Sequence, residues 1–144
     1  MRYSAESAFD PVANLRLLRI SGDNIPDRVL VGIGQADPTS HLISTAKNLV
    51  DIRAWNYEGS VVEIETQAAM LTEIFSAGLG EGYAWVTNPA IHGVTLVFRR
   101  QLVDAGLGKP MAFTTLEAAL EYLGVTMDDF LRVESRLEAI QLPD

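Results

Sequence analysis

The chain has 144 residues, of which 48% are hydrophobic and 21% charged, so it is long enough to fold as one domain with a buried core. Its 11 basic and 19 acidic residues give a formal charge of −8, which disfavours nucleic acid or an anionic membrane as a partner, because both need a basic surface. Cysteine is absent, which excludes disulfides, thiolate catalysis and cysteine-ligated metals.

The amino-terminal sequence and the distribution of charge predict a cytoplasmic protein. The first ten residues, MRYSAESAFD, lack the apolar region of a secretory signal. The longest uncharged run, residues 82–98, is interrupted by Asn88-Pro89 and is short for a membrane span. No repeat or linker is visible, and we therefore expect a single domain over residues 1–144.

The first third of the chain predicts two strands, a segment of uncertain type and a third strand. Residues 2–9 and 15–20 flank the turn-forming DPVAN and predict an antiparallel hairpin. Residues 28–35, RVLVGIGQ, fit a strand by their Val, Ile and Gly content, but they also fit a helix capped by Asn24. Asp37-Pro38 ends this segment in either case. Residues 47–52 predict a buried central strand.

Residues 60–79 predict the longest helix of the chain. Apolar side chains recur there at steps of three and four residues, which places them on one face. Ser60 and Glu63 have the spacing of a capping box, and Gly78 and Gly80 supply a stop.

The remaining sequence alternates strand and helix. Strands are predicted at 83–87 and 111–113. Asn88-Pro89 predicts a helix with an Asn cap and a proline at its first position, ending near Gly106. Further helices follow the capping boxes Thr114/Glu117 and Thr126/Asp129. The last helix, within residues 126–144, carries the apolar stripe Met127, Phe130, Val133, Leu137 and Ile140.

This order predicts an α/β fold with a mixed five-stranded sheet. The hairpin comes first, and the last three strands are parallel because helical crossovers join them. The apolar stripe of the terminal helix must pack either on its own sheet or against a second subunit, and we expect it to favour a homodimer.

Four motifs, in this order, resemble the SpoIIAA-like (STAS-like) domain superfamily. They are Asp37-Pro38, LVDIR at 49–53, AWVTNP at 84–89 and FTTLEAALEYL at 113–123. The resemblance covers roughly residues 1–124 and leaves the terminal helix outside. It implies a βα superhelix, favours a helix at residues 28–35, and implies a non-enzymatic regulatory or protein-interaction module similar to anti-sigma factor antagonists.

Ser60 has two interpretations. The resemblance implies a phospho-acceptor near this position, where a helix N-terminus favours an anion. The family's Asp-Ser-Ser-Gly motif is absent, and Glu58 and Glu63 would repel a phosphate. Ser60 alternatively acts only as the helix cap.

Two aromatic residues, Trp55 and Tyr57, follow the central strand at the carboxyl edge of the sheet, where ligands of open α/β sheets bind. They either contact a partner or ligand, or fold back over the helix ends. Asp51 and Arg53 predict an ion pair at the strand end. The candidate binding or switch site comprises Asp51, Arg53, Trp55, Tyr57, Ser60 and Asn88.

We predict no catalytic residue, metal site or cofactor. His41 and His92 are the only histidines, and no G-x-S-x-G motif occurs. GLGEG at 78–82 follows a predicted helix and precedes a strand, the reverse of a phosphate-binding loop. The expected function is therefore interaction with a protein partner. The alternative is a domain that binds a small hydrophobic molecule or lipid beneath Trp55 and Tyr57.

Overall fold

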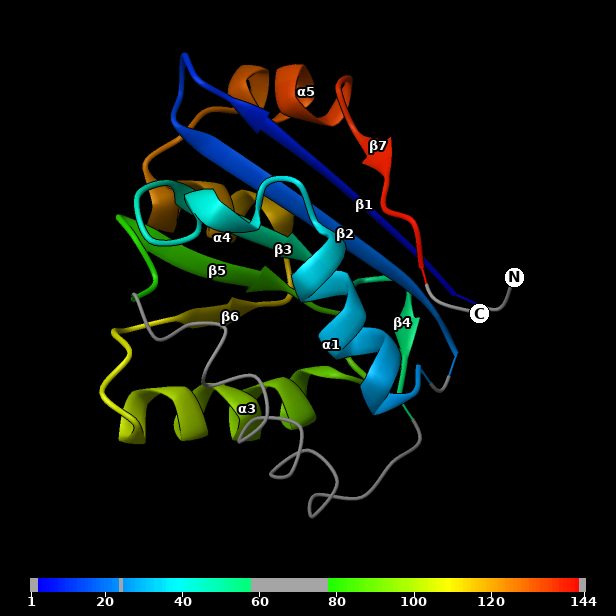
Figure 1. The fold of residues 1–144 in the computed structure, drawn as a ribbon. Helices are drawn as coiled ribbons and strands as arrows, with labels where there is room; N and C mark the ends of the chain where they lie inside the picture. The colour runs from blue at the N-terminus through cyan, green and yellow to red at the C-terminus, as the bar shows by residue number, and fades with distance from the viewer. Residues whose placement is uncertain (1–2, 24, 58–77, 143–144) are drawn as a thin grey trace.

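The computed structural model describes residues 3–23, 25–57 and 78–142, which form an α/β domain with a seven-stranded sheet (Figure 1). The strand order is β6-β5-β3-β2-β1-β7, and β4 pairs with the end of β2. None of the described helices is long and apolar enough to cross a membrane. The strands are β1 (Tyr3–Asp10), β2 (Leu15–Asp23), β3 (Lys47–Asp51), β4 (Trp55–Asn56), β5 (Gly82–Val86), β6 (Met111–Phe113) and β7 (Glu138–Ala139). The helices are α1 (Asp27–Ala36), the 3₁₀ turn η1 (Ser40–Leu42), α3 (His92–Asp104), α4 (Leu116–Leu123) and α5 (Met127–Glu134).

The sheet is mixed, as the sequence predicts. β1 and β2 pair antiparallel along their full length, while β3, β5 and β6 are added in parallel register. The predicted count of five strands is wrong, because the sheet contains two further short strands. These are β4, which extends β2 in parallel, and β7, which pairs antiparallel with β1. Both are two residues long, too short to show an alternating pattern.

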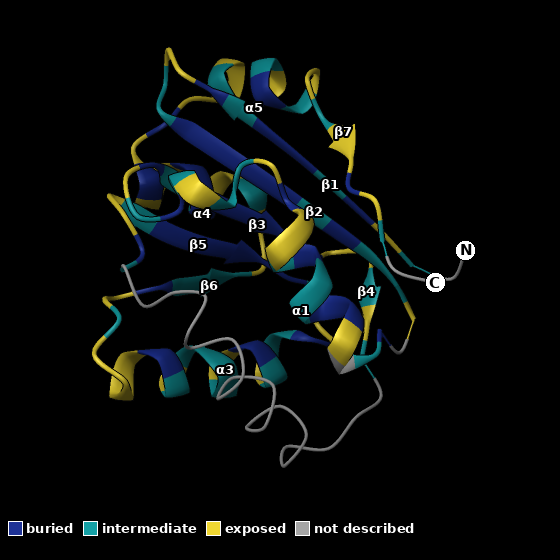
Figure 2. Cartoon of the chain, in the orientation of Figure 1, coloured by how far each residue is buried: buried dark blue, intermediate teal, exposed yellow. Residues whose placement is uncertain are grey.

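Helices cover both faces of the sheet. α1 and α3 pack on one face, and α4 and α5 pack on the other (Figure 1). Neighbouring residues of a strand therefore enter different cores: Val50 packs toward α1 and α3, whereas Leu49 packs toward α4. Figure 2 shows the consequence, with the central strands β2, β3 and β5 largely buried.

The segment at 28–35 is helical, the alternative that the resemblance favours. Val29, Leu30 and Ile33 are buried against the sheet, so the helical period explains the apolar positions. Pro26 occupies the N-cap, and its carbonyl oxygen accepts from the N–H groups of Val29 and Leu30. The predicted Asn24 cap lies outside the described residues. Asp37 adopts an extended conformation before Pro38 and ends the helix as expected.

Two predicted helix starts are shifted along the chain. Asn88 Oδ1 accepts from the N–H groups of Ala90 and Ile91, which folds these residues into a turn, and α3 begins only at His92. Thr115, not Thr114, caps α4 through the N–H of Ala118. The capping box of Thr126 and Asp129 on α5 is present as predicted.

The terminal helix is shorter than predicted. α5 ends at Glu134, and Ile140 N donates to Ala5 O over 2.8 Å beside the short strand β7. The open edge of β1 offers backbone partners that compete with continuation of the helix. Phe130 and Val133 of α5 are buried against the protein's own sheet. Residues 60–77 of the helix predicted at 60–79, including the Ser60/Glu63 capping box, lie outside the described residues.

Candidate functional site

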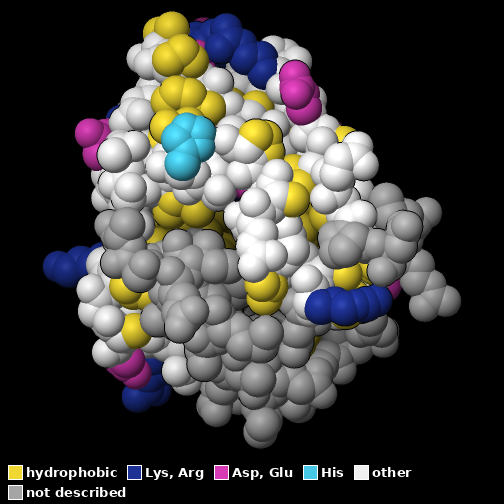
Figure 3. All heavy atoms as spheres, in the orientation of Figure 1, with side chains coloured by type: hydrophobic (Ala, Val, Ile, Leu, Met, Phe, Trp, Pro, Cys, Tyr) yellow, Lys and Arg dark blue, Asp and Glu magenta, His cyan; other side chains and the backbone are white. Residues whose placement is uncertain are grey.

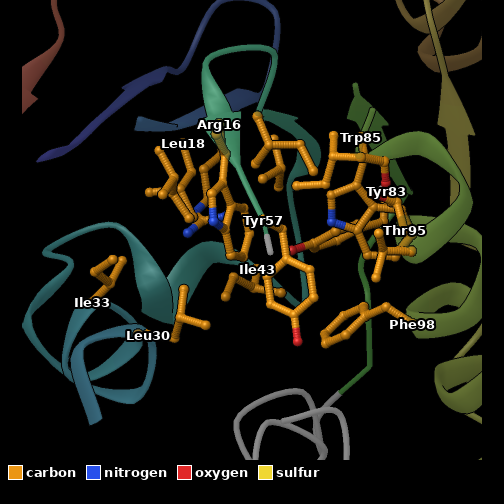
Figure 4. Close-up of a pocket in the computed structure, with 17 residues that line it drawn as sticks. Arg16, Leu18, Leu30, Ile33, Ile43, Tyr57, Tyr83, Trp85, Thr95 and Phe98 are labelled. Atoms are coloured by element: carbon orange, nitrogen blue, oxygen red, sulfur yellow. Dashed lines mark hydrogen bonds between the residues drawn. The ribbon is translucent and has the colours of Figure 1, made fainter. Parts of the chain in front are cut away.

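A cavity of about 110 Å³ lies between the sheet and the helices α1 and α3 (Figure 4). Its walls are mostly apolar. In Figure 4, Leu30 and Ile33 of α1 lie on one side, Thr95 and Phe98 of α3 lie on the other, and Tyr57 lies between them. Figure 3 shows apolar side chains in the hollow on this face and charged side chains toward the outline of the view.

The periods of strand and helix explain how the sequence builds these walls. Alternate residues of β2, β3 and β5 face the cavity because a strand repeats every two residues. α3 contributes positions spaced three and four residues apart. The resulting lining includes Leu18, Ile20, Val50, Tyr83 and Trp85 from the strands, and Ile91, Val94, Thr95 and Phe98 from α3 and its first turn.

Among the described residues, five aromatic rings line the cavity, including both tryptophans of the chain. Trp85 meets Tyr83 at 5.1 Å and Phe98 at 5.7 Å between ring centroids, and Trp55 meets Tyr57 at 6.3 Å. All three pairs are edge-to-face, the arrangement that the quadrupoles of aromatic rings favour. The walls therefore present ordered aromatic surface.

Arg16 is the only charged side chain among the described residues of the lining, and its charge is matched inside the protein. Its Nη2 pairs with Asp37 Oδ2 at 2.5 Å, and the two side chains are 2% and 0% exposed. Its Nε donates to Thr39 Oγ1 over 3.0 Å, and its Nη1 donates to Asn48 Oδ1 over 3.4 Å.

The carboxylate of Asp37 stays ionised. Burial raises its pKa, but the charge of Arg16 and the hydrogen bonds from Thr39 outweigh burial and hold the pKa below its ordinary value. Arg16 and Asp37 therefore form a neutral pair at one end of the cavity.

Two further polar groups belong to the wall. Burial raises the pKa of Tyr83 to about 12, so its phenol stays protonated and uncharged at neutral pH. The Nε1 atom of Trp55 is buried and has no hydrogen-bond partner in the described part of the chain. A buried N–H without an acceptor costs about 1–3 kcal/mol.

Asp51 and Arg53 form the ion pair that the sequence predicts, at 2.9 Å, but they do not line the cavity. Asp51 also pairs with Arg19 at 2.9 Å, and Arg19 pairs with Glu134 of α5 on the opposite face of the sheet. Burial raises the pKa of Asp51, but the hydrogen bonds and charge of Arg53, with the bond from Arg19, hold it below its ordinary value. This cluster joins β2, β3 and α5.

Asn88 connects the candidate residues through the backbone. Its Nδ2 donates to Arg53 O over 2.8 Å and lies 3.3 Å from Trp55 O. The structure thus brings Arg53, Trp55, Tyr57 and Asn88 together, but only Trp55 and Tyr57 reach the cavity. Ser60 lies outside the described residues.

Sequence reasoning missed the contributions of α1, α3 and Arg16 to this site. The one signal for Arg16 is its position inside the apolar run LRLLRI, where a basic residue needs a buried partner.

Comparisons with protein-family models, curated proteins and solved structures found no match for this chain. Among the described residues, no group of three or more His, Asp or Glu side chains is placed to hold a metal ion. The function is therefore argued from the cavity itself.

Proposed function

We propose that this protein binds a small apolar molecule in the cavity between the sheet, α1 and α3. The observation that carries the proposal is the apolar, aromatic lining of about 110 Å³ of space between the sheet and two helices. A cavity of roughly 150 Å³ lined by Leu, Ile and Phe binds benzene, so the scale suits a single ring. Ligand pockets are typically apolar with a few placed polar groups, which describes this one.

The proposal assigns binding and no reaction. Two polar side chains at the wall are engaged within the protein: Arg16 pairs with Asp37, and Thr95 Oγ1 donates to Ile91 O over 2.9 Å. These partners stabilise the wall, and using the groups on a substrate would require breaking buried bonds.

A pair of variants on one helix tests the proposal. Val94 lines the cavity, whereas Leu96 is 44% exposed on another side of α3. Val94→Phe should fill the cavity and weaken toluene binding at least tenfold, while Leu96→Phe should leave it unchanged. Binding is followed by protein-observed NMR and by the shift in melting temperature. Absence of toluene binding to the wild-type protein would refute the function.

The regulatory role implied by the resemblance is a second proposal. The hairpin followed by parallel strands supports this proposal only at the level of sheet topology, and topology does not fix function. If Ser60 is a switch, Ser60→Asp should change the affinity for a protein captured from the native cell. Equal affinity would remove the switch.

A homodimer is part of this second proposal. Met127 and Leu131 are exposed on α5 and supply an apolar surface for it. Sedimentation of the full chain at monomer mass would refute the homodimer.

A further inference from the structure

One wall of the cavity contains a glycine that lies inside a helix. Leu30, Ile33 and Gly34 of α1 line the cavity, and Gly34 is half-buried. Leu30 and Gly34 are four residues apart, so they lie one turn from each other on the same face of the helix. A side chain at position 34 would therefore extend from the face that lines the cavity. Because this residue is glycine, the backbone of α1 itself forms that part of the wall.

The backbone conformation of α1 does not require this glycine. The described glycines with a positive φ do not include Gly32 or Gly34, so a residue with a side chain can adopt the backbone at either position. Glycine is also a poor helix former, and alanine in a helix interior favours folding about fivefold relative to glycine. A glycine inside a helix usually has a packing or functional reason. The cavity beside Gly34 supplies such a reason.

Gly32 provides a matched control within the same helix. It is also half-buried, but it lies roughly 200° around the helix axis from Gly34. It does not line the cavity. Replacing either glycine by alanine adds the same methyl group and improves the helix propensity of α1 in the same direction. The two substitutions therefore differ in whether the methyl group is added to the face that lines the cavity.

We infer that Gly34 sets the size limit of the ligand, because its missing side chain leaves room for part of the ligand against the backbone of α1. This inference rests on the proposed function. The cavity volume of about 110 Å³ suits a single ring, so the ligand class is a single apolar ring with at most a short alkyl chain. One methylene group more or less in an apolar pocket changes affinity about 10- to 200-fold. Gly34→Ala removes about as much space as one such group occupies.

A series of alkylbenzenes measures the size limit. Benzene, toluene, ethylbenzene and propylbenzene differ by one carbon at each step, and NMR titration gives their affinities for the wild-type protein, Gly34→Ala and Gly32→Ala. In the wild-type protein, affinity should rise with each carbon until the cavity is full and then fall. Gly34→Ala should weaken the larger members most, with a loss of at least tenfold for the ligand that the wild-type protein binds best. Gly32→Ala should reproduce the wild-type series.

Two results would overturn the inference. One is the same series of affinities for Gly34→Ala and Gly32→Ala. The other is a loss in Gly34→Ala that is equal for every ligand, because a general disturbance of the cavity does not depend on ligand size.

A measurement on the wild-type chain holds even if Gly34→Ala does not fold. Bound toluene should give nuclear Overhauser effects to the Hα protons of Gly34 and none to those of Gly32. Absence of the Gly34 effects in the complex would show that the ligand does not lie against this residue.

The outcomes separate this inference from the proposed function. If no member of the series, toluene included, binds the wild-type protein, the proposed function fails and the inference fails with it. If toluene binds and Val94→Phe weakens it, but Gly34→Ala leaves the whole series unchanged, binding in the cavity stands. The role assigned to Gly34 is then wrong.

Discussion

Asp37→Asn should be among the most destabilising single substitutions in this protein. Asn keeps the shape of Asp and retains an oxygen that can accept from Thr39 N and Thr39 Oγ1, at 2.8 and 2.7 Å in the wild-type protein. The change removes the negative charge and replaces Oδ2 by an amide NH₂, a donor, opposite Arg16 Nη2. It leaves the guanidinium of Arg16 buried, 2% exposed, without its counterion.

The expected loss in the free energy of unfolding is about 3–5 kcal/mol, the range for removing one partner of a buried ion pair. A domain of this size has a total stability of about 5–15 kcal/mol, so the variant should be close to unfolding. Arg16→Met in the Asp37→Asn background should recover part of the loss, because it removes the unmatched charge. The two substitutions are therefore strongly non-additive.

Urea unfolding followed by tryptophan fluorescence measures these differences, since Trp55 and Trp85 both line the cavity. The matched control is Asp104→Asn, which breaks an exposed 3.9 Å ion pair with Arg100 and should cost less than about 0.5 kcal/mol. Exposed ion pairs contribute less than about 1 kcal/mol to stability. A loss below about 1 kcal/mol for Asp37→Asn would therefore mean that Arg16 and Asp37 do not act as a buried pair. A double variant less stable than Asp37→Asn would also contradict the reasoning.

Three further predictions concern single side chains. The pKa of Asp51 is lowered in the fold, so its contribution is full above the unfolded value of about 4 and is lost as pH falls below it. In urea unfolding between pH 6 and pH 2, Asp51→Asn should differ most from wild type at pH 6. Gly80→Ala should lower the melting temperature, because φ is 71° and an added Cβ would lie 2.3 Å from the carbonyl oxygen of Ala46; Gly93→Ala, which meets no atom within 4 Å, should not. Thr115→Ala should cost about 1 kcal/mol as a lost cap, and the same change at the preceding threonine should cost little, both measured in urea.

The parts of the fold that the sequence predicts are those with strong local signals. The hairpin and the parallel strands are confirmed because alternating or continuous apolar runs bounded by turns define them. Residues 28–35 fit helix and strand equally, and their contact with the sheet, where Val29 and Ile33 are buried, explains the helix. Local pattern cannot supply that tertiary contact.

In the terminal segment, a clear helical pattern gave a wrong prediction. The stripe from Met127 to Ile140 has helical spacing throughout, yet the chain turns after Glu134 and Ile140 packs beside β1. The strand edge that competes for this segment lies more than a hundred residues away in the sequence. No window of local sequence contains it.

Only two residues of the cavity lining could be predicted from the sequence. Trp55 and Tyr57 were placed by the rule that ligands bind beside the carboxyl ends of parallel strands, and both line the cavity. The space itself depends on gaps between side chains of α1, α3 and three strands. A gap is a property of packing and has no residue pattern of its own.

The polar network at one end of the cavity explains how apolar walls can stay apart. Asp37 ends α1, and its ion pair with Arg16 ties the end of that helix to β2. Asn48 bonds Arg16 and lies within 3.1 Å of the carbonyl oxygens of Ile43, Ala46, Leu79 and Gly82, which ties β2 to the segments entering β3 and β5. If α1 collapsed onto the sheet, the buried pair of Asp37 and Arg16 would break, and each unpaired group would cost about 1–3 kcal/mol. The hydrophobic gain from closing the cavity is of similar size, at about 24 cal/mol per Å³. The same buried groups that make the fold sensitive to Asp37→Asn therefore hold α1 apart from the sheet beside the cavity.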